Sequence, residues 1–259
     1  MFKAERLEKI KTLVLDRKQV DVSSLSKLLN VTEVTIRSDL EQLEQAGFLK
    51  RLHGGAILNE EIADKQENDD SLCEKMFSYD KNKERVARIA AAQIQENDHI
   101  FLGGGETCYY IARELTHFKR LTILTNNLHI AYAISPHMNI HLTLTGGQML
   151  PGRFCMAGDM FHKIIENLYV NKSFFSVAGV DLVAGYTLES TQEITVFREM
   201  VARSRQVNLV VDHTKFDRIS FAKLDDLTLC DRVISDEKIP SEYAEYYREH
   251  GISLIHSTK

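Results

Sequence analysis

Apolar residues recur at helical spacing through the N-terminal part of the chain. The pattern predicts helices over residues 3–18, 23–29 and 32–46. Ser23 or Ser24 is the expected N-cap of the second helix, and Gly47 is expected to end the third in a left-handed conformation. The positions expected on the inner faces are Leu7, Ile10, Leu13, Val14 and Arg17, then Leu25, Leu28 and Leu29, then Ile36, Leu40 and Leu43.

Two short β-rich runs follow the third helix. Residues 48–52 and 56–58 are expected strands, joined through His53, Gly54 and Gly55. Helices followed by such a ribbon predict a small winged helix-turn-helix domain, the head, over residues 1–58. The next segment begins NEEIADKQENDDS, with six carboxylates and one lysine. Because it is too polar to pack, residues 59–76 are predicted to be an acidic linker.

Beyond residue 77 the pattern changes to short apolar runs separated by helix-like stretches. The runs are HIFL, LTILT, IHLTLT, FFSVAGV, VNLVVD and RVISD. Strands that are apolar nearly from end to end, and that alternate with helices, indicate a parallel sheet covered on both faces. The sequence therefore predicts an α/β protein in which the head precedes a larger α/β domain, the body, with a mostly parallel sheet over residues 77–259.

Composition narrows the functional classes. The 259 residues are 44% hydrophobic and 27% charged, as in globular proteins with a buried core. The net charge of −5 is uneven, because residues 1–59 have ten Lys and Arg against eight Asp and Glu, whereas the remainder is acidic. The sequence has no apolar run of membrane-spanning length and no signal-peptide core, so a cytoplasmic protein without a membrane partner is expected. The four cysteines are isolated, which predicts neither a disulfide framework nor a metal site.

The head has the side chains that a DNA-reading helix needs. With Ile36, Leu40 and Leu43 inward, the exposed N-terminal half of the third helix would present polar residues to the major groove. An arginine can bond bidentately to guanine, and a threonine can contact phosphate or a thymine methyl group. A plain helical bundle with a solvated outer face is the alternative. The predicted DNA-binding residues are Thr32, Glu33, Thr35, Arg37 and Ser38 on the helix, and Lys50, Arg51 and His53 on the ribbon.

The stretch VTEVTIRSDLEQLEQAGFLKRLHGGA resembles the N-terminal signature of the DeoR family of bacterial transcriptional regulators, nearly residue for residue. The family pattern is S-x-x-T-I-R-R-D-L, a leucine ladder, and then R-x-H-G-G-A. One position departs, since Ser38 replaces the second arginine of the usual pair. A phosphate or base contact is thereby lost, which predicts a different operator preference.

Small and polar residues follow successive strands of the body, where open α/β sheets bind ligands. Each has a structural explanation when taken alone, but their order also resembles the DeoR family sensor domain. That domain is similar in fold to ribose-5-phosphate isomerase and glucosamine-6-phosphate deaminase. The effector-binding residues that the resemblance implies are Gly104, Gly105, Glu106, Thr107, Thr125, Asn126, Gly146, Gly147, Gly179, Asp181, Arg198 and Lys215.

The first of these motifs departs from the family pattern. Gly103 and Gly104 replace the usual Asp-Ser, Glu106 stands where a hydroxyl normally faces a phosphate, and Phe197 stands where the family often has lysine. A carboxylate beside a phosphate is repulsive unless Lys215 or Arg198 offsets it. Two interpretations stay open: a phosphorylated effector held mainly by backbone amides, or an effector without phosphate.

The resemblance implies a regulator, and specifically a repressor of a carbohydrate-utilisation operon, whose operator affinity responds to a sugar or sugar phosphate. A homodimer or homotetramer is expected, because paired heads match palindromic half-sites. We expect no enzymatic activity, no cofactor and no metal. An active sugar-phosphate isomerase or deaminase, with Asp181 or Glu193 as its base, is the alternative. A third hypothesis is a DNA-binding protein whose body only oligomerises.

Overall fold

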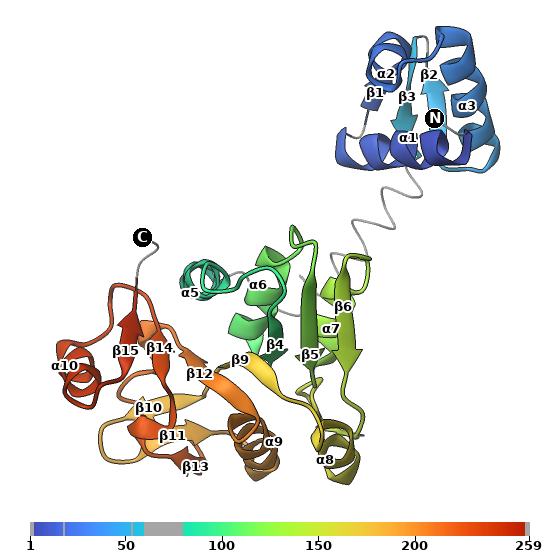
Figure 1. Ribbon diagram of the computed structural model, residues 1–259. Helices are drawn as coiled ribbons and strands as arrows, with labels where there is room; N and C mark the ends of the chain where they lie inside the picture. Colours follow the sequence, from blue (N-terminus) through green and yellow to red (C-terminus); the bar gives the residue numbers. More distant parts are fainter. Residues whose placement is uncertain (1–2, 18, 53, 60–79, 257–259) are drawn as a thin grey trace. The chain divides into compact units, whose positions relative to one another are not determined.

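The computed structural model describes residues 3–17, 19–52, 54–59 and 80–256, which fall into two compact units, Met1–Ser78 and Tyr79–Lys259. These units contain the predicted head and body, and Figure 1 shows the elements of each. Most of the predicted linker lies outside the described residues. Its first residue, Asn59, donates from Nδ2 to the Gly47 carbonyl at 2.7 Å and so lies against the head.

The head is a helical domain with a small antiparallel sheet. Its core contains the predicted Ile10, Val14, Ile36, Leu40 and Leu43, each at most 3% exposed. The strand order is β1-β3-β2, so β3 pairs with both of the other strands. The elements are α1 (Lys3–Arg17), β1 (Gln19–Asp21), α2 (Val22–Leu29), α3 (Glu33–Gln45), β2 (Leu49–Leu52) and β3 (Gly55–Leu58).

Three details of the head differ from the prediction. The N-cap of α2 is Asp21, because its carboxylate accepts the Ser24 backbone N–H at 2.7 Å, and neither Ser23 nor Ser24 caps the helix. Leu28 is 59% exposed and Arg17 is also exposed, so neither belongs to the core. Strand β1 was not expected, since a three-residue strand has no periodic pattern of its own.

The centre of the body is a parallel sheet of seven strands in the order β15-β14-β12-β9-β4-β5-β6. Every neighbouring pair in this sheet is parallel, which confirms the predicted α/β class. The strands are β4 (His99–Leu102), β5 (Leu121–Thr125), β6 (Ile140–Leu144), β9 (Val170–Phe175), β12 (Ser204–Val210), β14 (Arg232–Ile234) and β15 (Ser253–Ile255).

Helices cover both faces of this sheet, as the apolar strands predict (Figure 1). Val207 and Leu209 of β12 join the core that contains Phe197 of α9 and Tyr243 of α10. On the opposite face, α5 contacts β12 and β14, and it packs on α6. The helices are α5 (Lys81–Ala91), α6 (Glu106–Glu114), α7 (Leu128–Ile134), α8 (Asp159–Ile165), α9 (Thr191–Val201) and α10 (Ser241–Glu249), with short 3-10 turns η1 (His213–Lys215) and η2 (Leu227–Leu229).

Two smaller β-structures were not predicted. An antiparallel sheet consists of β10 (Gly179–Asp181), β11 (Gly185–Leu188) and β13 (Ala222–Asp225). A two-stranded hairpin consists of β7 (Gln148–Met149) and β8 (Met156–Ala157). The run FFSVAGV is therefore not one strand, because it spans the end of β9 and the start of β10. Both additions lie beside the carboxyl ends of the central strands, where the candidate ligand residues are found.

Candidate nucleic-acid interface and ligand pocket

The N-terminal half of α3 is an exposed polar surface. Thr32 caps the helix, since its Oγ1 accepts the Thr35 backbone N–H at 3.3 Å. Arg37 Nη2 lies 3.5 Å from Glu33 Oε2, and both side chains are more than half exposed. Such an exposed pair is weak, so the guanidinium is available for another partner. The predicted Ser38 is exposed as well.

Val34 is a surface feature of α3 that the sequence analysis missed. It is 76% exposed, although Ile36, two positions later on the same helix, is buried. Its position outside the helical ladder of Ile36, Leu40 and Leu43 is the signal that could have identified it. A branched apolar side chain on a recognition helix is suited to contact with a thymine methyl group.

The ribbon holds Arg51 in a defined position. Glu44 of α3 accepts the Arg51 backbone N–H at 2.9 Å and its Nε–H at 2.8 Å. These bonds lower the pKa of Glu44, the backbone donor contributing most. Lys50 is exposed on the same strand, while the predicted contact His53 lies outside the described residues. A Cβ on Gly55 would lie 2.2 Å from the Val20 carbonyl oxygen, so this glycine permits the close approach of β1 to β3.

A buried ion pair joins α1 to α3. Arg6 Nε lies 2.5 Å and Arg6 Nη2 lies 3.1 Å from the two carboxylate oxygens of Asp39, and both residues are buried. The bond to Asp39 raises the pKa of Arg6. A bidentate pair of this kind fixes orientation as well as distance, and it therefore sets how α3 lies on α1.

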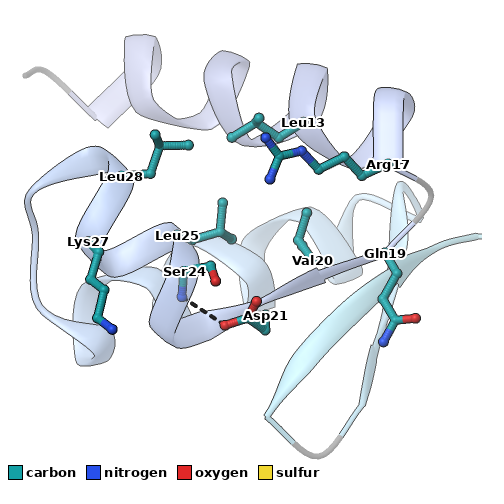
Figure 2. Close-up of a pocket in the computed structure, with 9 residues that line it drawn as sticks. All are labelled: Leu13, Arg17, Gln19, Val20, Asp21, Ser24, Leu25, Lys27 and Leu28. Carbon is teal, nitrogen blue, oxygen red and sulfur yellow. Dashed lines mark hydrogen bonds between the residues drawn. The ribbon is translucent and has the colours of Figure 1, made fainter.

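A groove of about 670 Å³ lies between α1 and α2 of the head (Figure 2). Its residues are Leu13, Arg17, Gln19, Val20, Asp21, Ser24, Leu25, Lys27 and Leu28. The bonds from Ser24, and then from Ser23, lower the pKa of Asp21 to about 2. None of the predicted DNA-binding residues in the described part of the head lines this groove, so it is separate from the exposed surface of α3.

A small cavity lies in the body at the carboxyl ends of β4, β5 and β9. Its volume is about 30 Å³, which is space for about one water molecule. Gly104 and Asn126 are the two predicted effector residues that line it, and they follow β4 and β5 respectively. The complete lining is Gly103, Gly104, Asn126, Cys155, Phe175, Ser176, Leu188, Glu193, Val196 and Phe197.

Close packing explains the residue types in the cavity walls. A Cβ on Gly104 would lie 2.2 Å from Cys155 Sγ, so any side chain there would displace the thiol. The rings of Phe175 and Phe197 stack with centroids 3.8 Å apart. Phe197, which stands where the resembling family often has lysine, is 4% exposed. An apolar ring thus fills the place expected of a cation.

Two hydrogen-bond acceptors face this cavity. Asn126 Nδ2 donates to the Met156 carbonyl at 2.9 Å, but its Oδ1 is buried with no hydrogen-bond partner in the part of the chain that the structure describes. Glu193, in the first turn of α9, is half-buried, and burial raises its pKa. Its Oε1 lies 3.9 Å from Arg153 Nη1, and Arg153 also pairs with Glu189. A buried acceptor such as Asn126 Oδ1 requires a donor from a ligand or water.

The partner of Glu106 differs from the expected one. Lys215 and Arg198 were named as the cations that could offset this carboxylate, but Lys83 of α5 pairs with it, and also lies 3.2 Å from Asp80. Burial lowers the pKa of Lys83, but the two carboxylates outweigh burial and the net shift is upward. The reason is the packing of α5 on α6, which brings residues far apart in sequence together.

The remaining predicted effector residues have structural contacts of their own. Thr125 Oγ1 donates to the Leu102 carbonyl at 2.7 Å. Asp181 caps its own turn by accepting the Val183 and Ala184 N–H groups, which lowers its pKa, the Ala184 bond contributing most. Arg198 donates to the Leu224 carbonyl at 3.3 Å.

The other members of the predicted set do not line the cavity either. Gly105 is the N-cap of α6 and Thr107 is buried in the first turn of that helix. Gly147 has a φ of +138° against Ala157, and Gly146 lies beside it. Gly179 begins β10, and the half-buried Lys215 ends η1. Of the predicted set, the cavity therefore brings together Gly104 and Asn126.

Comparisons with known proteins assign both units. Residues 6–62 match the DeoR-like helix-turn-helix domain, and residues 79–237 match the DeoR C-terminal sensor domain. The chain belongs to the DeoR family. It is accordingly a DNA-binding transcriptional regulator with a sensor domain, and the expected resemblance is confirmed.

Three relatives are similar over nearly their whole length. The HTH-type transcriptional regulator GolR of Listeria innocua is 31% identical over 98% of each chain. The putative aga operon transcriptional repressor of Escherichia coli O157:H7 is 30% identical over 97% of this chain and 93% of its own. The lactose phosphotransferase system repressor of Staphylococcus aureus is 32% identical over 92% of this chain and 95% of its own.

Among solved structures, ribose 5-phosphate isomerase A from Methanocaldococcus jannaschii is 16% identical, covers 52% of this chain and 53% of its own, and has a TM-score of 0.38.

Within the described ranges, no helix of this DeoR-family protein has the length and apolar character to span a membrane. The same ranges contain no cluster of three or more His, Cys, Asp or Glu side chains arranged to hold a metal ion.

Proposed function

We propose that this protein represses a carbohydrate-utilisation operon, and that a sugar or sugar phosphate bound in the body changes its affinity for operator DNA. The observation that carries the proposal is the similarity, over more than nine tenths of the chain, to the aga operon and lactose phosphotransferase repressors. The cavity with its unpartnered Asn126 acceptor supports a ligand site in the body.

In this proposal the exposed half of α3 reads the major groove. Arg37 contacts a base, Thr32, Thr35 and Ser38 contact phosphate or base edges, and Glu33 releases Arg37 on binding. Lys50, Arg51 and His53 contact the DNA backbone beside the groove. Two such heads, in a homodimer or homotetramer, would occupy the halves of a palindrome. The protein would act in the cytoplasm, with the acidic segment 59–76 between its two domains.

The proposal assigns no catalysis to the body. An isomerase needs a carboxylate base beside the reacting carbons and polar groups for the enediolate. Asp181, one candidate base, accepts the N–H groups of its own turn instead of lining the cavity. Glu193 does line it, but Phe197, Val196 and Leu188 make much of the wall apolar, and the polar side chains Asn126 and Ser176 beside it are not titratable.

Deletion of the gene, followed by transcript sequencing, tests repression. We expect transcripts of one carbohydrate operon to rise in the deletion strain and to return to normal when the gene is restored. A fall in those transcripts would make the protein an activator, and no change would reject the proposal.

Purified protein should not turn over ribose 5-phosphate or glucosamine 6-phosphate, and measurable turnover would favour the isomerase or deaminase alternative.

A further inference from the structure

We propose that the ligand of the body cavity carries no phosphate: it is a sugar or polyol whose hydroxyl groups donate to Asn126 Oδ1 and to the Glu193 carboxylate. This inference rests on the proposed function, because it names the class of effector that the same cavity takes. It chooses between the two interpretations that the sequence left open.

The first argument is the hydrogen-bond type of the cavity. Asn126 is 3% exposed, and its Oδ1 has no hydrogen-bond partner among the described residues. Glu193 contributes the carboxylate of the lining. Both groups accept hydrogen bonds, and the hydroxyl of Ser176 in the same lining can accept as well as donate, so the set matches a ligand that donates. Sugar hydroxyls donate, whereas the phosphate oxygens of an ionised sugar phosphate only accept, so these two groups suit hydroxyls and not a phosphate.

The second argument is charge. Among the described residues that line the cavity, Glu193 is the charged one, and it is acidic. The nearby Arg153 is shared between Glu193 and Glu189, which leaves that group of three with a net charge of −1 when all are ionised. A phosphate dianion placed here would be repelled by this net negative charge.

The third argument concerns the N-terminus of α6, the place where an anion would otherwise bind. The helix brings its own carboxylate there, Glu106, in the first turn. Lys83 pairs with both Glu106 and Asp80, so this second group of three also has a net charge of −1. Lys83 is thus committed to two carboxylates of the protein, and the net negative charge of the group disfavours a phosphate at this helix end.

The walls also suit a sugar ring. Phe175, Phe197, Leu188 and Val196 give the cavity an apolar side, on which the C–H face of a sugar can pack. The cavity volume of about 30 Å³ is too small for a sugar, so the walls must separate when a sugar binds. The Arg153 to Glu193 distance of 3.9 Å is longer than a hydrogen bond, and a ligand hydroxyl would replace this loose contact.

Calorimetric titration of the full chain with matched pairs tests the inference. The probes are D-glucitol, D-galactose and D-glucosamine, the 6-phosphate of each, and inorganic phosphate. We expect at least one parent compound to bind about tenfold or more tightly than its ester, because the parent gains a hydrogen bond where the ester meets a repulsive charge. Inorganic phosphate should not bind. An ester that binds as tightly as its parent overturns the inference, and so does the absence of binding by every parent at millimolar concentration.

A charge-removing variant tests the residue assignment. Glu193→Gln keeps the shape of the side chain and should weaken binding of the active parent compound by about tenfold or more. Glu166→Gln removes the same charge from an exposed position, the C-cap of α8, and is the matched control, with no expected change. Unchanged affinity in Glu193→Gln, with a normal melting curve, would remove Glu193 from the site.

Failure of the inference and failure of the proposed function remain distinguishable. Preference for a phosphate ester leaves a ligand-responsive repressor in place and changes only its effector. Loss of the proposed function is seen instead as unchanged operon transcripts in the deletion strain, whatever the calorimetry shows.

Discussion

Replacing Arg37 by alanine removes the side chain that we propose reads a base. In the free protein Arg37 has one weak contact, a 3.5 Å approach to Glu33 with both side chains more than half exposed. An exposed pair of this type contributes about 0.3–0.5 kcal/mol. A bidentate contact to guanine contributes about 1–3 kcal/mol of discrimination. The net loss in Arg37→Ala is therefore about threefold to a hundredfold in operator affinity.

Fluorescence anisotropy at one fixed salt concentration measures this loss on operator DNA and on a scrambled duplex. Arg248→Ala is the matched control, since Arg248 forms a similar exposed pair with Glu245, on α10 of the body. We expect Arg37→Ala to lower the ratio of specific to non-specific affinity and Arg248→Ala to leave it unchanged. An unchanged ratio in Arg37→Ala would refute the placement of α3 as the recognition helix.

Three further variants test the packing on which the site depends. Asp21 has a pKa of about 2 in the folded head, below the value of about 3.9 in an unfolded chain, so its ionised carboxylate stabilises the head above about pH 4, and this stabilisation is lost as the pH falls through about 2. Asp21→Asn should therefore differ from the native chain in melts at pH 5 and match it only below about pH 2. Gly104→Ala should destabilise the body by about 1–3 kcal/mol in urea titrations, and by less in a Cys155→Ala background, because the clash is with that thiol. Phe197→Ala should cost about 3–5 kcal/mol, or about 6–20 °C in melting temperature, whereas Phe221→Ala, at an 82% exposed position, should change little. A difference for Asp21→Asn that is independent of pH, equal effects of Gly104→Ala in both backgrounds, or equal effects of the two phenylalanine variants would each contradict the structural reasoning.

Local patterns explain why much of the fold was predictable. The helical spacing of Ile36, Leu40 and Leu43 is a property of consecutive residues, and all three are buried as expected. The apolar strand runs were similarly sufficient for the parallel sheet. Leu28 was assigned to the core from the same spacing, but the face that α2 buries is set by its neighbours, and Leu28 is outside it.

Contacts between distant residues account for what the sequence did not reveal. Arg6 and Asp39 are separated by 33 positions, and Lys83 and Glu106 by 23, so their pairing depends on how the helices pack. The candidate site shows the same limit. Gly104 and Asn126 follow strands and were recognised by position, but Glu193 joins them only because α9 packs beside the strand ends.

The central claim is that a ligand of the body controls DNA binding by the head. Anisotropy of the full chain on DNA from upstream of its own gene, at fixed salt, tests it most directly when titrated with and without the active sugar or polyol. Coupling between two sites is typically about 1–3 kcal/mol, so operator affinity should change by about fivefold to 150-fold while scrambled DNA is unaffected. Tight, specific binding that stays the same at saturating ligand would contradict the claim.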